Sequence, residues 1–162
     1  MWRAVAPVVA LLGMLTACGG PDPAAAPALP DDAVIAYAFH DASVPPPYHR
    51  SVTLTVTKDE SHLVIDSYGD VLADETLATP AAVWTTLADT VTSLADLPVA
   101  PAPEGCTGGT GIELTVSSGS GTTVDLAPEF CGGSNEDLQP AINGWISPAR
   151  KLFPATDELA PS

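Results

Sequence analysis

A short hairpin with a cysteine beyond each of its ends places the strongest constraint on how this chain can fold. Residues 111–116 (GIELTV) alternate apolar and polar side chains, which is the pattern of a strand with one buried face. A Ser-Gly-Ser-Gly turn follows, and residues 122–126 predict the return strand. Cys106 precedes this unit and Cys131 follows it. A bond between the two cysteines would therefore fasten the open end of the hairpin.

The expected strand register brings the two cysteines close together. If Val116 faces Thr122 across the turn, residue 106 falls opposite residue 132, which is next to Cys131. We therefore expect a structural Cys106–Cys131 disulfide, which closes a loop of about 25 residues and would stabilise the fold by roughly 3–4 kcal/mol. Metal binding and thiol catalysis are the alternatives. They are disfavoured because neither cysteine lies in a Cys-x-x-Cys motif or has a close histidine partner.

The N-terminus predicts export and attachment to lipid. Arg3 is followed by an apolar stretch, residues 4–17, that has signal-peptide length and is short for a membrane span of about 20 residues. The stretch closes with Leu-Thr-Ala-Cys, a tetrad that resembles the lipobox of bacterial lipoproteins. The resemblance implies cleavage of residues 1–17 as a signal peptide and attachment of diacylglycerol to Cys18. The alternative is an ordinary secretory signal with a chance cysteine.

Lipid at Cys18 would hold the protein on the extracytoplasmic face of the cell membrane, because two acyl chains anchor firmly. That compartment is oxidising enough for a disulfide. Residues 18–33 would then form the lipidated cysteine and a Pro/Ala-rich tether, whose composition favours extended backbone. Residues 34–154 carry the periodic patterns of a single domain, and residues 155–162 (ATDELAPS) predict a short disordered tail.

Further strands are predicted upstream of the hairpin. Residues 34–39 form a plausible first strand, and residues 51–57 (SVTLTVT) alternate apolar side chains with hydroxyl side chains. Residues 62–67 predict a second strand after a polar turn, antiparallel to residues 51–57, and residues 71–77 predict a weaker additional strand. These segments indicate an antiparallel meander, because short polar turns separate them.

Two segments have helical periodicity. Thr79 and Pro80 suit the N-cap and first helical position, and a following apolar stripe at three- and four-residue spacing predicts the main helix (Val83, Trp84, Leu87, Val91 and Leu94). A second apolar face extends to Phe153, where Pro140 and Pro148 are expected to kink or divide the helix. The element order predicts an α+β fold. We expect an antiparallel sheet of about four to six strands packed by one main helix and a C-terminal helical segment.

Net charge restricts the partners that the protein can bind. The chain of 162 residues has five Lys+Arg and twenty Asp+Glu, a formal net charge of -15. Nothing in it could neutralise a row of phosphates, so nucleic acid is excluded as a partner. An acidic surface favours a protein partner with a basic surface, and the association should weaken as salt is raised.

The sequence contains no compact catalytic constellation. His40, His49 and His62 show no helical i,i+4 pairing and lie in no metalloprotease-like motif. His40 beside Asp41 could serve acid–base chemistry, as could His62 near the preceding acidic residues Asp59 and Glu60. Surface strand and turn positions explain the three histidines more simply. We expect no catalytic residue and no cofactor.

The acidic residues predict a solvated face in preference to a metal site. Asp66, Asp70 and Asp74 recur every four residues, without the spacing or the closing Glu of an EF-hand loop. The glycine-rich stretch 105–111 lacks the Lys of a phosphate loop and precedes a strand where such a loop precedes a helix. We expect its glycines to supply positive φ near the disulfide.

The element order from about residue 51 to residue 153 is similar to that of the emfourin-like small inhibitors of bacterial metalloproteases. The correspondence consists of two strands, an amphipathic helix ending in Leu-x-x-Leu-Pro, a Cys/Gly-bounded hairpin with the core 112–116, and a terminal helix. The resemblance implies protease inhibition as one function, without assigning an inhibitory residue. We expect a noncatalytic, membrane-anchored domain that binds a protein or ligand. The alternatives are a protease inhibitor, as the resemblance implies, and a hydrolase-type envelope enzyme.

Overall fold

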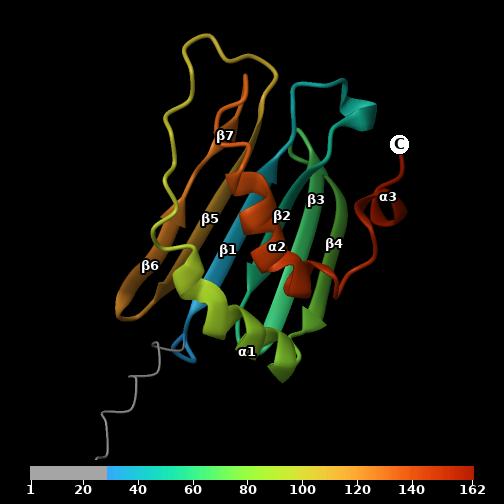
Figure 1. Cartoon of the computed structure of the whole chain (residues 1–162). Coiled ribbons are helices and arrows are strands. Elements are labelled where there is room, and N and C mark those ends of the chain that lie inside the picture. The colour runs from blue at the N-terminus through green and yellow to red at the C-terminus, as the bar shows by residue number, and fades with distance from the viewer. Residues whose placement is uncertain (1–28) are drawn as a thin grey trace, which may run out of the picture.

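One antiparallel sheet organises the part of the chain that the structure, a computed structural model, describes: residues 29–162 (Figure 1). Its six main strands have the spatial order β4-β3-β2-β1-β5-β6, and the short β7 pairs with β5. Their bounds are β1 Val34–His40, β2 Ser51–Val56, β3 Glu60–Ser67, β4 Asp70–Ala78, β5 Thr110–Ser118, β6 Gly121–Leu126 and β7 Glu129–Phe130. The predicted α+β class is confirmed, and the predicted weak strand is the full edge strand β4.

The alternating sequence pattern becomes rows of apolar side chains that cross the sheet. The register aligns five side chains in one such row, one from each of β3, β2, β1, β5 and β6 (Leu63, Leu54, Tyr37, Leu114 and Leu126). All five are buried. Neighbouring side chains in a strand point to the opposite face, where Thr53, Ala36 and Glu113 are exposed.

Two helices pack on the buried face of the sheet, as Figure 1 shows. They are α1 (Ala81–Thr90), which continues as a 3-10 turn over Val91–Ser93, and α2 (Leu138–Arg150). Every residue of the predicted stripe on α1 is buried except Val83, which is partly buried. The predicted N-cap is wrong, because Pro80 occupies that position and the Thr79 hydroxyl lies 2.8 Å from the buried Ser61 hydroxyl.

The proline residues near the C-terminus do not divide α2, contrary to expectation. Pro140 lies in the first turn of the helix, where backbone N–H groups have no intrahelical acceptor. Pro148 lies in the last turn, so its missing N–H removes a single hydrogen bond, the one to the Gly144 carbonyl. Prolines at these two positions therefore leave one continuous helix from Leu138 to Arg150.

Both ends of the domain extend beyond the predicted boundaries. Leu29 and Ala33 are buried in the core, so folded structure begins within the segment that was predicted to be tether. The disordered tail is also wrong, since Thr156–Leu159 form a short helix, α3, and Ala160 is buried. Arg50 donates from Nε to the Ala160 carbonyl and from Nη2 to the Pro161 carbonyl, each at 2.8 Å. Tertiary hydrogen bonds therefore order a segment that its composition predicted to be disordered.

Trp84→Ala should strongly destabilise the domain, because Trp84 is only 6% exposed within the apolar stripe of α1. Removal of a large buried aromatic side chain costs about 3–5 kcal/mol of unfolding free energy. Denaturant unfolding followed by circular dichroism measures the effect. Thr85→Ala is the matched control, because Thr85 is the exposed neighbour on the same helix. Equal stabilities of the two variants would contradict the assignment of Trp84 to the core.

Candidate functional site

The Cys106–Cys131 disulfide is present, with its two Cα atoms 6.0 Å apart. The hairpin register that predicted it is wrong in detail, because Val116 pairs with Val124 and not with Thr122. A register shift after Val116 restores tight pairing at the turn, where Ser118 faces Gly121. The bond forms because β7 pairs with β5 and brings the chain just before Cys131 beside the start of β5.

The glycine-rich loop before β5 shapes this disulfide end of the sheet. Gly105 and Gly108 have φ values of +76° and +75°, which L side chains rarely adopt. A Cβ at Gly109 would lie 2.9 Å from the Phe130 carbonyl oxygen and 3.1 Å from the Cys106 sulfur. The loop therefore needs glycine for close approach to the disulfide, which accounts for the sequence pattern without a phosphate.

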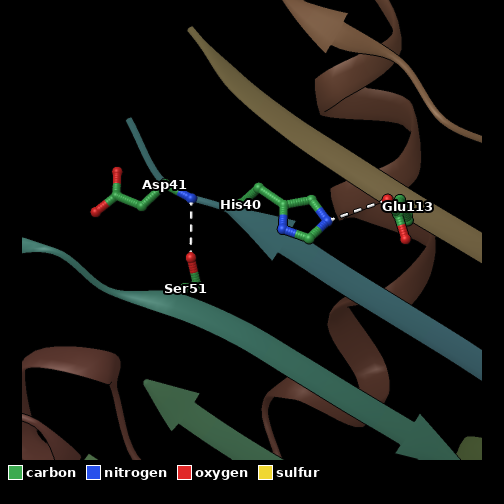
Figure 2. A network of polar contacts seen from close by, with 4 residues as sticks. All are labelled: His40, Asp41, Ser51 and Glu113. Atoms are coloured by element: carbon green, nitrogen blue, oxygen red, sulfur yellow. Dashed lines mark hydrogen bonds and ion pairs between the residues drawn. The ribbon is translucent and has the colours of Figure 1, made fainter. Parts of the chain in front are cut away.

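His40 and Asp41 do not form the acid–base pair that their adjacency suggested (Figure 2). The His40 ring points to β5, where its Nε2 lies 3.4 Å from Glu113 Oε1, and both side chains are more than half exposed. The Asp41 carboxylate accepts hydrogen bonds from the backbone N–H groups of Ala42 and Arg50, each at 2.8 Å. Asp41 therefore braces the loop between β1 and β2, while His40 belongs to an exposed ion pair.

His62 also pairs differently from the sequence expectation. Its Nε2 lies 2.8 Å from Asp74 Oδ1 on β4, whereas the expected neighbours were Asp59 and Glu60. The side chains of His62 and Asp74 are 40% and 60% exposed. This contact joins the edge strand β4 to its neighbour β3 on the uncovered side of the sheet, in a position open to solvent.

His49 is buried, which corrects the surface position expected for all three histidines. It is 5% exposed, and its ring stacks on Tyr68 with 3.9 Å between ring centroids. Its Nε2 lies 3.5 Å from the Ser51 hydroxyl, and its Nδ1 has no hydrogen-bond partner among residues 29–162. No carboxylate contacts the ring in that part of the chain, so His49 packs the β1–β2 loop against the β3–β4 turn.

The edge of the sheet at β4 is an exposed acidic surface. Among residues 29–162, strand β4 pairs with β3 alone, and all nine of its residues except Ala73 are exposed. Asp70, Asp74 and Glu75 lie on it beside exposed apolar side chains (Val71, Leu72 and Leu77). The sequence pattern indicated a strand here, but its position at the edge depends on the pairing of the whole sheet.

The described residues contain neither a metal cluster nor a membrane-spanning helix. From Leu29 to Ser162, no three or more His, Cys, Asp or Glu side chains are grouped so that they could hold a metal ion. Within the same range, no helix has the length and hydropathy needed to cross a membrane. The predicted lipidation residue, Cys18, lies outside the described residues.

Comparison of the chain with protein-family models, with curated proteins and with solved structures gave no match. The fold, the disulfide end and the acidic edge therefore have to be interpreted from their own geometry.

Replacement of both cysteines, Cys106→Ser with Cys131→Ser, should lower the free energy of unfolding by about 3–4 kcal/mol, because the unfolded chain regains the entropy of an open loop. Denaturant unfolding under oxidising conditions measures this difference. Addition of a reductant should destabilise the parent by a similar amount and leave the double variant unchanged. A parent protein with two alkylatable thiols in the native state would contradict the bond.

Proposed function

We propose that this protein is a lipid-anchored, noncatalytic binding domain that holds a basic partner along the β4 edge of its sheet. The partner contributes an extended segment that pairs with β4 and places basic side chains beside the carboxylates of that strand. The observation that carries the proposal is the combination of an edge strand exposed at every residue but Ala73 with three acidic side chains, Asp70, Asp74 and Glu75.

The backbone of β4 supports recognition by strand addition. A terminal strand pairs with one neighbour, so its outward N–H and C=O groups are available to a further strand. β4 spans nine residues, Asp70–Ala78, which is long for an edge strand. Val71 and Leu77, which are 61% and 39% exposed, offer apolar contact to the side chains of an added strand.

The acidic side chains give this edge its selectivity. Like charges placed on paired strands are destabilising, so two copies of β4 repel each other. The same carboxylates attract lysine or arginine on a strand of another protein. The charges therefore favour binding of a basic partner over pairing of two copies of β4. A formal net charge of -15 adds long-range attraction for such a partner at low salt.

The position of the N-terminal end of the domain is compatible with a tether from a lipid at Cys18. The described chain begins at Leu29, at the end of the sheet that carries the β2–β3 and β5–β6 turns (Figure 1). There, Asp31 forms an ion pair with Lys58, and Asp32 accepts a hydrogen bond of 2.9 Å from the Gly119 N–H. With this end toward the membrane, the strands stand away from the lipid and β4 is accessible along its length.

The histidine geometry supports binding in preference to hydrolysis. His40 and His62 each contact one carboxylate on an exposed strand, and His49 is stacked in the loop region away from those carboxylates. A general base must lie within hydrogen-bond reach of the proton that it removes, usually in a concave site. These three positions are separate. His49 Nε2 lies 3.5 Å from the Ser51 hydroxyl, but its ring is buried and its Nδ1 has no hydrogen-bond partner among residues 29–162, so no carboxylate completes a Ser–His–Asp arrangement there.

An extended peptide of alternating lysine and valine should bind the full-length protein in nanodiscs of zwitterionic lipid. Amide hydrogen exchange of β4 should slow in the complex, because the outward N–H groups gain acceptors. Asp70→Asn with Glu75→Gln should weaken binding roughly two- to tenfold. Raised salt should also weaken binding by the parent.

The matched control for this experiment is Asp89→Asn with Asp96→Asn, which removes the same charge at exposed positions outside the sheet. It should change the affinity much less than the β4 variant. A peptide with glutamate in place of lysine should leave the exchange of β4 unchanged. Equal weakening by the two double variants, or equal protection by the acidic peptide, would refute selection by the β4 carboxylates.

Radiolabelled palmitate should be incorporated into the parent protein in cells and not into Cys18→Ala, because the expected acyl chains are attached through Cys18. The parent should sediment with membranes, and the variant should be released from them. Cys106→Ser is the control, since it removes a cysteine assigned to the disulfide and should keep the label. Equal labelling of the parent and Cys18→Ala would overturn the anchoring part of the proposal.

A further inference from the structure

A cavity of about 470 Å³ lies between α2 and strands β1 and β2, on the helix-covered face of the sheet. This volume is within the range of about 300–1,000 Å³ that is typical of small-molecule sites. Its position is distinct from the β4 edge, because no β4 residue lines it.

The floor of the cavity is apolar. Val52 on β2 and Ile146 on α2 are buried side chains that face this space, and Phe39 on β1 is partly buried beside them. These groups offer dispersion contacts to a hydrocarbon chain or ring, which would also remove the remaining apolar surface from water. The floor therefore suits the apolar part of a small ligand.

The rim of the same cavity is basic, in a chain that is strongly acidic. Arg150 and Lys151 are consecutive at the C-terminal end of α2, and both line the cavity. The whole sequence has only five lysine and arginine residues, so two of them meet at one site. The three ion pairs found among residues 29–162 involve neither of the two. Their charges are therefore available to an anion from outside the chain.

The C-terminal segment holds Arg150 in place. Arg150 Nη1 donates to the Pro154 carbonyl and Nη2 donates to the Thr156 hydroxyl, each at 2.8 Å. A guanidinium group has five N–H donors, so these two bonds leave donors for a further acceptor. Fixed orientation lowers the entropy cost of binding, and a planar guanidinium matches the two oxygens of a carboxylate.

Burial also affects two of the titratable groups at the cavity, Tyr37 and Arg150. It raises the pKa of Tyr37 to about 12, although the nearby Arg150 charge opposes that rise. Burial lowers the pKa of Arg150, and Tyr37 acts in the opposite direction. Tyr37 thus remains a neutral phenol at neutral pH, and its hydroxyl donates to Asn143 Oδ1 at 3.0 Å. The cavity then contains a partly desolvated cation and no competing phenolate.

We propose that this cavity binds a small amphipathic carboxylate, with its apolar part on Phe39, Val52 and Ile146 and its carboxylate toward Arg150 and Lys151. Apolar contacts supply affinity, and the two cations select the acid over a neutral molecule of the same shape. A carboxylate fits the charge better than a multiply charged phosphate does, because one arginine and one lysine stand among many acidic side chains of the same chain.

Methyl NMR of the full-length protein in zwitterionic nanodiscs tests this site, with phenylpropionate as the probe. The methyl signals of Val52 and Ile146 should shift and saturate as phenylpropionate is added. Phenylpropanol, which keeps the ring and loses the charge, should bind at least about tenfold more weakly. Phenylpropylamine should bind still more weakly, since its cation meets Arg150 and Lys151.

Variants separate the contribution of charge from that of the fold. Lys151→Gln should weaken phenylpropionate binding about threefold without affecting stability, because Lys151 is exposed and forms no ion pair within residues 29–162. Arg150→Gln should weaken it about tenfold or more. Ser147→Trp should fill the cavity and abolish the methyl shifts. This variant keeps Arg150, so it tests the site independently if Arg150→Gln unfolds the C-terminal segment. Lys58→Gln removes an equal charge on the β2–β3 turn and should have no effect.

Two results would overturn the proposal. The first is equal affinity for phenylpropionate and phenylpropanol, which would mean that the cations do not recognise the ligand. The second is an absence of saturable shifts at Val52 and Ile146 at millimolar phenylpropionate. Neither result depends on peptide binding at β4, because the two sites share no residue.

Discussion

The row of apolar side chains that crosses the sheet is the interaction on which the other features depend. Leu54 from β2 and Leu114 from β5 flank Tyr37 at the centre of the row, and all three are buried beneath the helices. Burial of each such side chain contributes about 1.5–3 kcal/mol. Because the side-chain period of a strand is two, this row also fixes which residues face outward on every strand. The exposed position of His40, three residues after Tyr37 on β1, follows from it.

The same row links the core to the cavity. The Tyr37 ring packs in the row, while its hydroxyl reaches Asn143 on α2. Arg150 lies at the end of the same helix and is oriented by Pro154 and Thr156. The core therefore positions α2, and α2 together with the C-terminal segment positions a cation over an apolar floor. Folding of the last residues is required for this arrangement, since a disordered tail would leave Arg150 without its two acceptors.

Charge is distributed in a way that separates the two proposed sites. Acidic side chains dominate the exposed strands, including the free edge at β4, where a basic segment would be attracted. The basic residues Arg150 and Lys151 occur together at the cavity between α2 and strands β1 and β2. A protein with uniform acidic character would repel small anions everywhere. Here the fold concentrates cations at one concave position, and the local field there differs from the net charge of the molecule.

The sequence by itself determined the strands, the main helix and the disulfide partners, because these depend on local periodicity and on the presence of two cysteines in the folded domain. It placed Trp84 in the core for the same reason. Tertiary structure alone decided what depends on contacts between distant segments. Arg50 orders the C-terminal residues through Ala160, and His62 chooses Asp74 over its sequence neighbours. The cavity also joins residues from β1, β2 and α2, which no local pattern could bring together, because the pairing of the whole sheet sets their spacing.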